Sequence, residues 1–135
     1  MARILLDSSV LIDLLRGRPA ADRLRQLRRQ GDEAWVCAVS VEEIWRGIRT
    51  GEEPVTLRLL RGLRLAPLGV EQGVLAGSWR RQFSANGVTL HQADCLIAAA
   101  AVGVGARLAT GNPSDFPMGD LPMGDLVVES WPPGA

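Results

Sequence analysis

Four acidic residues stand at points of the chain where a strand ends or a helix begins. Asp7 ends the apolar run of residues 3–6, and Asp115 lies just beyond a later apolar strand. Glu43 and Asp94 each fall in the expected first turn of a helix. Chemistry in open parallel sheets gathers outside the carboxyl ends of the strands. We therefore expect these four carboxylates to point into one cleft at such an edge.

Converging carboxylates have a specific chemical use. They repel one another, and without a cation one or more of their pKa values should rise. Mg²⁺ or Mn²⁺ relieves that repulsion, because hard divalent cations take oxygen ligands. Such an ion can orient and deprotonate a water for attack on phosphorus, and two ions can share the task. The residue types therefore predict metal-dependent hydrolysis of phosphodiester bonds, with the number of ions left open.

Each acid also has a plainer structural interpretation. Ser40 and Glu43 fit a capping box, in which the glutamate bonds back to the amide of the serine. Asp94 could complement the helix dipole, and Asp115 could cap a short turn. Asp7 has the least structural reason to be acidic, because the serines that follow it could cap the next helix.

Apolar runs alternate with helical spacing along the chain, which predicts one domain over residues 1–135. Strands are expected over 3–7, 34–39, 106–110 and 126–129, with a short extended stretch at 65–68. Helices are expected over 9–16, 20–30, 40–50, 55–63, 70–85 and 89–104. The first strand lacks alternation, as central strands buried on both faces do. The expected fold class is α/β, a three-layer α/β/α domain with a mostly parallel central sheet.

All fifteen basic residues are arginine, and they balance fifteen acids. Residues 1–64 carry a net charge of +3, and residues 65–135 carry −3. Six arginines gather early in the chain, which indicates either a solvated helix face or phosphate contacts: Arg16, Arg18, Arg23, Arg25, Arg28 and Arg29. We take Arg25, Arg28 and Arg29 as the candidates for substrate binding. Four metal-neutralised acids would leave eleven against fifteen arginines, a balance that suits a nucleic-acid backbone.

The composition also excludes several functions. Without lysine the chain can be neither a P-loop nucleotide hydrolase nor a Schiff-base enzyme. Its lone histidine, His91, is expected at a helix start or on the surface, with substrate contact as the alternative. Cys37 and Cys95 lie in apolar segments, which predicts reduced core thiols. No apolar run reaches the roughly 20 residues of a membrane span, so we expect a cytoplasmic protein.

Four motifs in order give the chain a family resemblance. It resembles the PIN-domain ribonucleases, most closely the VapC toxin of VapBC toxin–antitoxin pairs, in the segments Asp7–Ile12, Glu43–Gly47, Ala93–Ala99 and Thr110–Phe116. This resemblance implies a PIN-like domain and an endoribonuclease that depends on Mg²⁺ or Mn²⁺ and cuts structured RNA. It also implies inhibition by a cognate VapB-like antitoxin and a homodimer.

The resemblance assigns roles to individual residues. It places the catalytic and metal-binding carboxylates at Asp7, Glu43, Asp94 and Asp115, and supporting polar groups at Ser8, Thr110 and Asn112. The segment Pro-Met-Gly-Asp-Leu departs from the family pattern, because it occurs twice in succession, at 117–121 and 122–126. We interpret it as a duplication in a surface loop, without a catalytic role. It could displace the last strand.

A second function from another class stays open. The same acids could hold a metal, or bind a basic partner, in a non-catalytic regulatory module that binds metal or RNA. Metal-dependent cleavage of RNA would distinguish the enzyme from this module.

Overall fold

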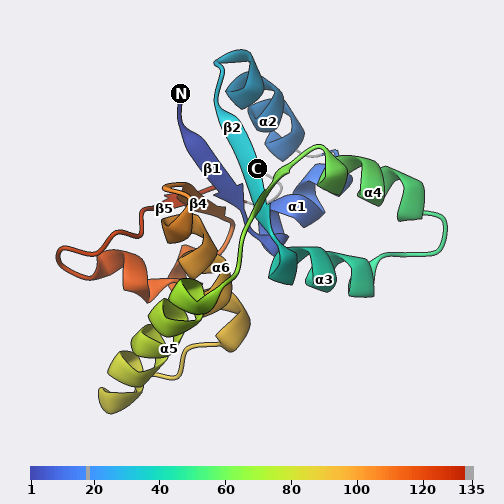
Figure 1. Ribbon diagram of the computed structural model, residues 1–135. Coiled ribbons are helices and arrows are strands. Elements are labelled where there is room, and N and C mark those ends of the chain that lie inside the picture. Colours follow the sequence, from blue (N-terminus) through green and yellow to red (C-terminus); the bar gives the residue numbers. More distant parts are fainter. Residues whose placement is uncertain (18, 133–135) are drawn as a thin grey trace.

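The computed structural model describes residues 1–17 and 19–132 and contains one parallel sheet. Its strands are β1 (Arg3–Leu6), β2 (Glu33–Cys37), β3 (Arg64–Ala66), β4 (Arg107–Thr110) and β5 (Val128–Ser130). The strand order is β3-β2-β1-β4-β5, and every neighbouring pair is parallel. β1 is therefore the central strand, as its unbroken apolar sequence predicts (Figure 1).

Helices cover both faces of this sheet. They are α1 (Ser8–Leu15), α2 (Pro19–Arg29), α3 (Ala38–Gly47), α4 (Glu53–Arg61), α5 (Val70–Ala85) and α6 (Gln92–Gly103). Two 3₁₀ turns, η1 (Pro113–Asp115) and η2 (Pro117–Asp120), connect β4 to β5. Figure 1 shows α1 to α4 on one side of the sheet and α5 with α6 on the other. The predicted three-layer α/β/α architecture is confirmed.

The two layers of core follow from the alternation of side chains along β1. Ile4 and Leu6 pack with apolar residues of α1 to α4, whereas Leu5 packs with α5 and α6. Successive strand residues point to opposite faces, so a strand between two helix layers must be apolar at every position. On the second face, residues 98–101 of α6 are four fully buried alanines. Their small side chains let α6 lie close to both the sheet and α5.

Several boundaries differ from the sequence prediction by two or three residues, and three of them matter for the site and the duplicated segment. α3 begins at Ala38 rather than at residue 40, because the chain passes from the last residue of β2 directly into the helix. The Ser40 hydroxyl is thereby buried inside α3 without a hydrogen-bond partner. α6 begins at Gln92 rather than at residue 89. The last strand begins at Val128 rather than at residue 126.

The two copies of Pro-Met-Gly-Asp-Leu have different environments. Met118 of the first copy is 1% exposed and belongs to the core, whereas Met123 of the second copy is fully exposed. Met123 also has a φ of 58°, which is unusual for a residue other than glycine. The prediction of a surface loop therefore holds for residues 122–125 of the second copy, whereas Leu126 is buried, and it is wrong for the first copy, whose Met118 lies in the core.

Both cysteines of the chain lie in the core. Cys37 and Cys95 are both free and buried, as expected. No helix of residues 1–17 and 19–132 combines the length and the apolar character that a membrane span requires.

Candidate functional site

The fold brings the four predicted carboxylates toward one edge of the sheet. Asp7 follows the end of β1, and Glu43 lies in the helix that follows the end of β2. α6 leads into the start of β4, so it runs opposite to that strand and its first turn, with Asp94, lies at the strand's far end. Asp115 follows the end of β4 in η1. Parallel strands end on the same side, which explains this grouping.

Asp7 is 6% exposed and has two structural roles. Its Oδ1 accepts hydrogen bonds from the Ser9 hydroxyl at 2.6 Å and from the Val10 amide at 3.2 Å, so Asp7 itself is the N-cap of α1. The prediction that a serine caps this helix is wrong. Burial raises the pKa of Asp7, although the hydrogen bonds from Ser9, Thr110 and the backbone oppose that rise. A neutral cap would serve the helix equally well, so the buried charge calls for another explanation.

Glu43 is half-buried and is held by the first residue of α1. The Ser8 hydroxyl donates to Glu43 Oε1 at 2.7 Å. Because α3 begins at Ala38, Glu43 lies in the second turn of the helix and cannot form the capping box with Ser40. The structural interpretation of this glutamate is therefore wrong, and Ser8 has the supporting position that the family resemblance implies.

Asp94 carries the clearest electrostatic signature of the site. Its pKa rises from 3.8 to about 6, first through burial and then through the charge of Asp115, with smaller contributions from Glu43 and Asp7. His91, the exposed N-cap of α6, opposes this rise. Asp94 lies in the first turn of α6, as predicted. Each of the other three carboxylates thus acts on Asp94.

A network of hydroxyl groups connects Asp7 to the end of β4. Ser9 Oγ donates to Asp7 and accepts from the Gly111 amide at 2.8 Å. Thr110, fully buried, hydrogen-bonds to Asp7, and its Oγ1 accepts from the Asn112 amide at 3.0 Å. Asn112 therefore contributes its backbone to this network, while its side chain is exposed. Ser9 was missed as a site residue, because the sequence offered it only as a helix cap.

These four carboxylates are the candidate ligands of a divalent cation. Within residues 1–17 and 19–132, no three His, Cys, Asp or Glu side chains are gathered closely enough to hold a metal ion. The charges of Asp115, Glu43 and Asp7 act on Asp94, but the four carboxylates do not gather around one point in the described part of the chain. Their chemistry nevertheless fits a hard cation, because all four donors are carboxylates and burial already disfavours the charge of Asp7 and Asp94.

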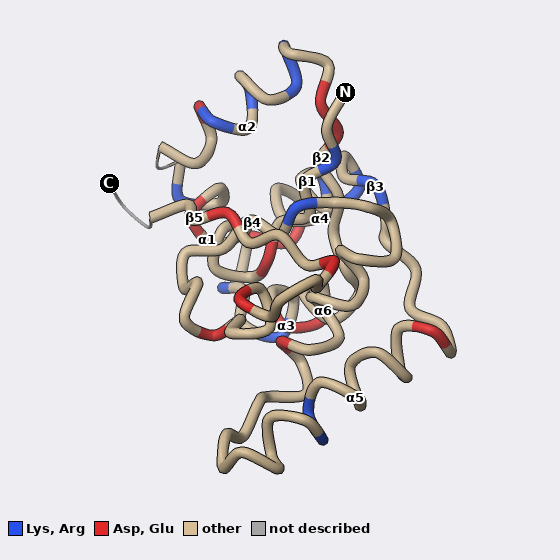
Figure 2. The backbone as a smooth tube through the Cα atoms, turned by 90° about the vertical axis from the view of Figure 1, so that its left-hand side faces the viewer, with Lys and Arg blue, Asp and Glu red and all other residues tan. Residues whose placement is uncertain are grey.

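The predicted substrate-binding arginines lie elsewhere. The end of α2 leads into the start of β2, which places Arg28 and Arg29 at the opposite edge of the sheet from Asp7. Arg25 forms an ion pair with Asp22, and Arg28 donates to the Gly62 carbonyl at 3.2 Å. In Figure 2, basic positions follow α2, whereas acidic positions gather near α3 and α6. RNA binding by these arginines stays a prediction. Arg18 of the same group lies outside the described residues.

Comparison with known proteins identifies relatives of the whole domain. The profile of the PIN domain family matches residues 4–116. Ribonuclease VapC10 of Mycobacterium tuberculosis is 39% identical over 116 residues, which are 85% of this chain and 86% of that protein.

Two solved structures share the fold. A chain in the structure of VapBC2 from Rickettsia felis, bound to a DNA fragment from its promoter, has a TM-score of 0.79 at 18% identity and covers 96% of this chain and 98% of that chain. A chain of VapBC-1 from nontypeable Haemophilus influenzae has a TM-score of 0.78 at 22% identity, with coverage of 96% and 98%. Together with the family profile and the 39% identity to VapC10, these matches confirm the resemblance seen in the motifs: the chain belongs to the PIN domain family.

Proposed function

We propose that the protein is an endoribonuclease that depends on Mg²⁺ or Mn²⁺ and acts as the toxin of a VapBC-type pair. One observation carries this proposal: burial and mutual repulsion raise the pKa of Asp94 at the carboxyl edge of the sheet, where Asp7, Glu43 and Asp115 also lie. Such an arrangement costs stability unless a cation is bound. The 39% identity to Ribonuclease VapC10 supports RNA as the substrate.

Asp7, Glu43, Asp94 and Asp115 would hold the ion. When bound, a divalent cation lowers the pKa of a water ligand and stabilises negative charge on a phosphate. Hydroxyl groups of the chain hold two of these carboxylates in position. Ser8 fixes one oxygen of Glu43, while Ser9 and Thr110 fix Asp7. Because metal ligands must be deprotonated, Asp94 has to release its proton first, which should make cation binding weaker below about pH 6.

The proposal includes partners and a location. The matching chains from Rickettsia felis and Haemophilus influenzae come from VapBC complexes, which supports a VapB-like antitoxin as the inhibitor. A homodimer and a cytoplasmic location follow from the family resemblance and from an RNA substrate.

Incubation with total RNA tests the activity. We expect cleavage with Mg²⁺ or Mn²⁺, no cleavage with EDTA, and none with Asp7→Asn, which keeps the N-cap because asparagine caps as well as aspartate does. The matched control is Asp120→Asn, the same change at an exposed acid of η2, which should cleave like the unmodified protein. RNA binding without cleavage under either metal would contradict the enzyme and favour the regulatory module.

A further inference from the structure

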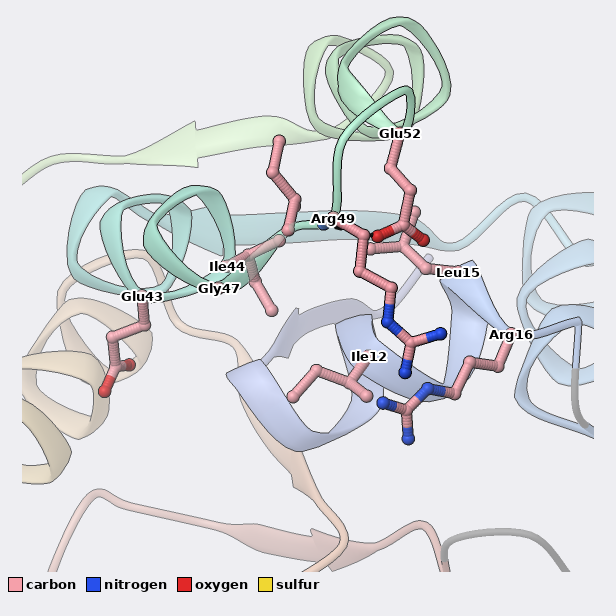
Figure 3. Close-up of a pocket in the computed structure, with 9 residues that line it drawn as sticks. Ile12, Leu15, Arg16, Glu43, Ile44, Gly47, Arg49 and Glu52 are labelled. Carbon is pink, nitrogen blue, oxygen red and sulfur yellow. Dashed lines mark hydrogen bonds between the residues drawn. The ribbon is translucent and has the colours of Figure 1, made fainter.

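A pocket of about 160 Å³ lies next to the candidate site, between α1, α3 and the segment leading to α4. Its lining residues are Ile12, Leu15, Arg16, Glu43, Ile44, Gly47, Ile48, Arg49 and Glu52. Figure 3 shows Glu43 at one end, with its carboxylate turned away from the two arginines at the other end. The pocket therefore extends from a residue of the candidate site to a pair of positive charges.

Arg16 and Arg49 both direct their guanidinium groups into this pocket (Figure 3). Among the described residues, neither guanidinium makes a hydrogen bond or an ion pair, in contrast to Arg23, which pairs with Glu129 at 2.6 Å. The nearby Glu52 carboxylate contacts the backbone instead of a guanidinium group, because its Oε1 accepts a hydrogen bond from the Arg49 backbone amide at 2.6 Å. Two arginines in one pocket without partners repel each other, and an anion between them would remove that repulsion.

The rest of the pocket suits a nucleotide. Ile12, Ile44 and Ile48 form an apolar wall, and Ile12 is 39% exposed. Such a wall can pack against a ribose or a base while a guanidinium pair holds the phosphate through its planar fork. Positive charge beside an apolar wall is thus complementary to one unit of a nucleic-acid strand.

The position along α1 says which phosphate this would be. Ser8, which holds Glu43, and Arg16 are eight residues apart, or about 12 Å along the helix axis at about 1.5 Å per residue. The backbone of Arg16 therefore lies about 12 Å from that of Ser8, a separation that suits a phosphate of the same strand beside the cleaved one.

We propose that Arg16 and Arg49 bind a backbone phosphate of the RNA substrate next to the bond that is cut. This inference rests on the proposed function and adds residues that the sequence did not single out as a pair. Continuity of the pocket with Glu43 favours the substrate as its occupant. An acidic segment of the antitoxin is the competing occupant.

A binding assay tests the pair. In an Asp7→Asn background, which prevents cleavage, a fluorescein-labelled RNA hairpin is titrated in Mg²⁺ between about 50 and 200 mM NaCl. Each phosphate contact to a single strand contributes about 0.7 to the slope of log K against log salt concentration. Because the pair holds one phosphate, Arg16→Gln with Arg49→Gln should lower this slope by about 0.7 and weaken binding at low salt at least tenfold. In the cleaving protein, the same double change should raise KM more than it lowers kcat.

The control removes two arginines at the opposite edge of the sheet. Arg3→Gln with Arg64→Gln causes the same loss of net charge, and both arginines pair with Glu33 at the strand starts. The salt slope of this control should match that of the parent. Arg16→Lys with Arg49→Lys should have the salt slope of the parent but only part of its affinity, because lysine lacks the planar fork.

Three results would overturn the inference. Equal slopes for the parent and the Gln pair would exclude a phosphate contact. Unchanged RNA binding together with weaker antitoxin binding would assign the pocket to the antitoxin. An equal loss in the Arg3 and Arg64 control would reduce the effect to net charge. If one of these results is obtained while the unmodified protein still cleaves RNA, only the role of the arginine pair is refuted and the proposed function stands. If it neither binds nor cleaves RNA, the proposed function fails as well.

Discussion

Replacement of Asp94 by asparagine should stabilise the protein in the absence of metal. The pKa of Asp94 rises from 3.8 to about 6, chiefly because the residue is partly buried and faces Asp115. A carboxyl group whose pKa is higher in the folded state opposes folding when it is ionised. The amide of asparagine would keep the shape of the side chain and remove that charge.

The size of the effect follows from the pKa values. The difference between 3.8 and about 6, at about 1.36 kcal/mol per pH unit, gives about 3 kcal/mol as an upper limit above pH 6. Solvent screening at this half-buried position reduces it to about 1–2 kcal/mol. Loss of a favourable charge in the first turn of α6 takes back about 0.3–1 kcal/mol. We therefore expect a net gain of about 1 kcal/mol, or a rise in Tm of about 3–6 °C for a domain of this size.

The sign of the pH dependence is specific. Below about pH 4, the carboxyl is protonated in both the folded and the unfolded chain, and the two proteins should differ little. Between about pH 4 and 6, the unfolded chain gives up its proton while the folded chain keeps it, so the stability of the unmodified protein falls as the pH rises. Above about pH 6, the full difference should be present.

Urea unfolding in EDTA at several pH values from about 4 to 7.5 measures this difference, with Asp120→Asn as the control for loss of one exposed charge. Added Mg²⁺ should then stabilise the unmodified protein more than the Asp94→Asn variant, because a ligand stabilises only the state that binds it. An Asp94→Asn variant that is less stable than the parent in EDTA at neutral pH would refute the argument from crowded charge.

Three further predictions concern the core and the site. Met118→Ala should cost about 2–5 kcal/mol in urea unfolding, whereas Met123→Ala in the identical local sequence should change stability by less than about 0.5 kcal/mol; equal losses would mean that the two copies share the core position. Burial raises the pKa of Cys95 to about 11 and also raises that of Cys37, so a maleimide should label both at neutral pH only after unfolding, and rapid labelling of the folded protein would contradict their burial. Ser9→Ala should cost about 1–3 kcal/mol and weaken Mg²⁺ binding in a calorimetric titration, because it frees Asp7 and leaves the Gly111 amide unpaired. Ser78→Ala, at a half-buried serine of α5 away from the site, is the control, and equal Mg²⁺ affinity in both variants would remove Ser9 from the site.

The layers of the fold could be predicted from sequence because the alternation of elements determines them. Strands that alternate with helices are compatible with few topologies, and the unbroken apolar run before Asp7 marks the central strand. The ends of elements were less predictable. Ser40 has the sequence of a helix cap, yet β2 continues directly into α3, and tertiary packing places that serine inside the helix. The capping interpretation of Glu43 failed for this reason.

The hydroxyl network could not be predicted from the sequence, because it depends on contacts between distant segments. Ser9 and Gly111 are 102 positions apart, and their hydrogen bond exists only because β1 and β4 are neighbours in the sheet. Which copy of the duplicated segment is buried could not be predicted either. Its two copies are chemically identical, so only the path of the chain from η1 to β5 decides which methionine enters the core.

Asp7 shows why the structural and functional interpretations of a residue need not exclude each other. An aspartate, an asparagine or a serine could each cap α1, so capping explains a small polar residue at position 7 but not its charge. The charge is unfavourable in the isolated chain, because burial raises the pKa of Asp7 and Asp7 in turn raises the pKa of Asp94. Cap and hydroxyl contacts therefore hold one carboxylate at a point where its charge is costly without a cation. A divalent ion would turn that cost into binding free energy, which is why the metal-free protein should gain stability from Asp94→Asn, a substitution at one of the four proposed ligands.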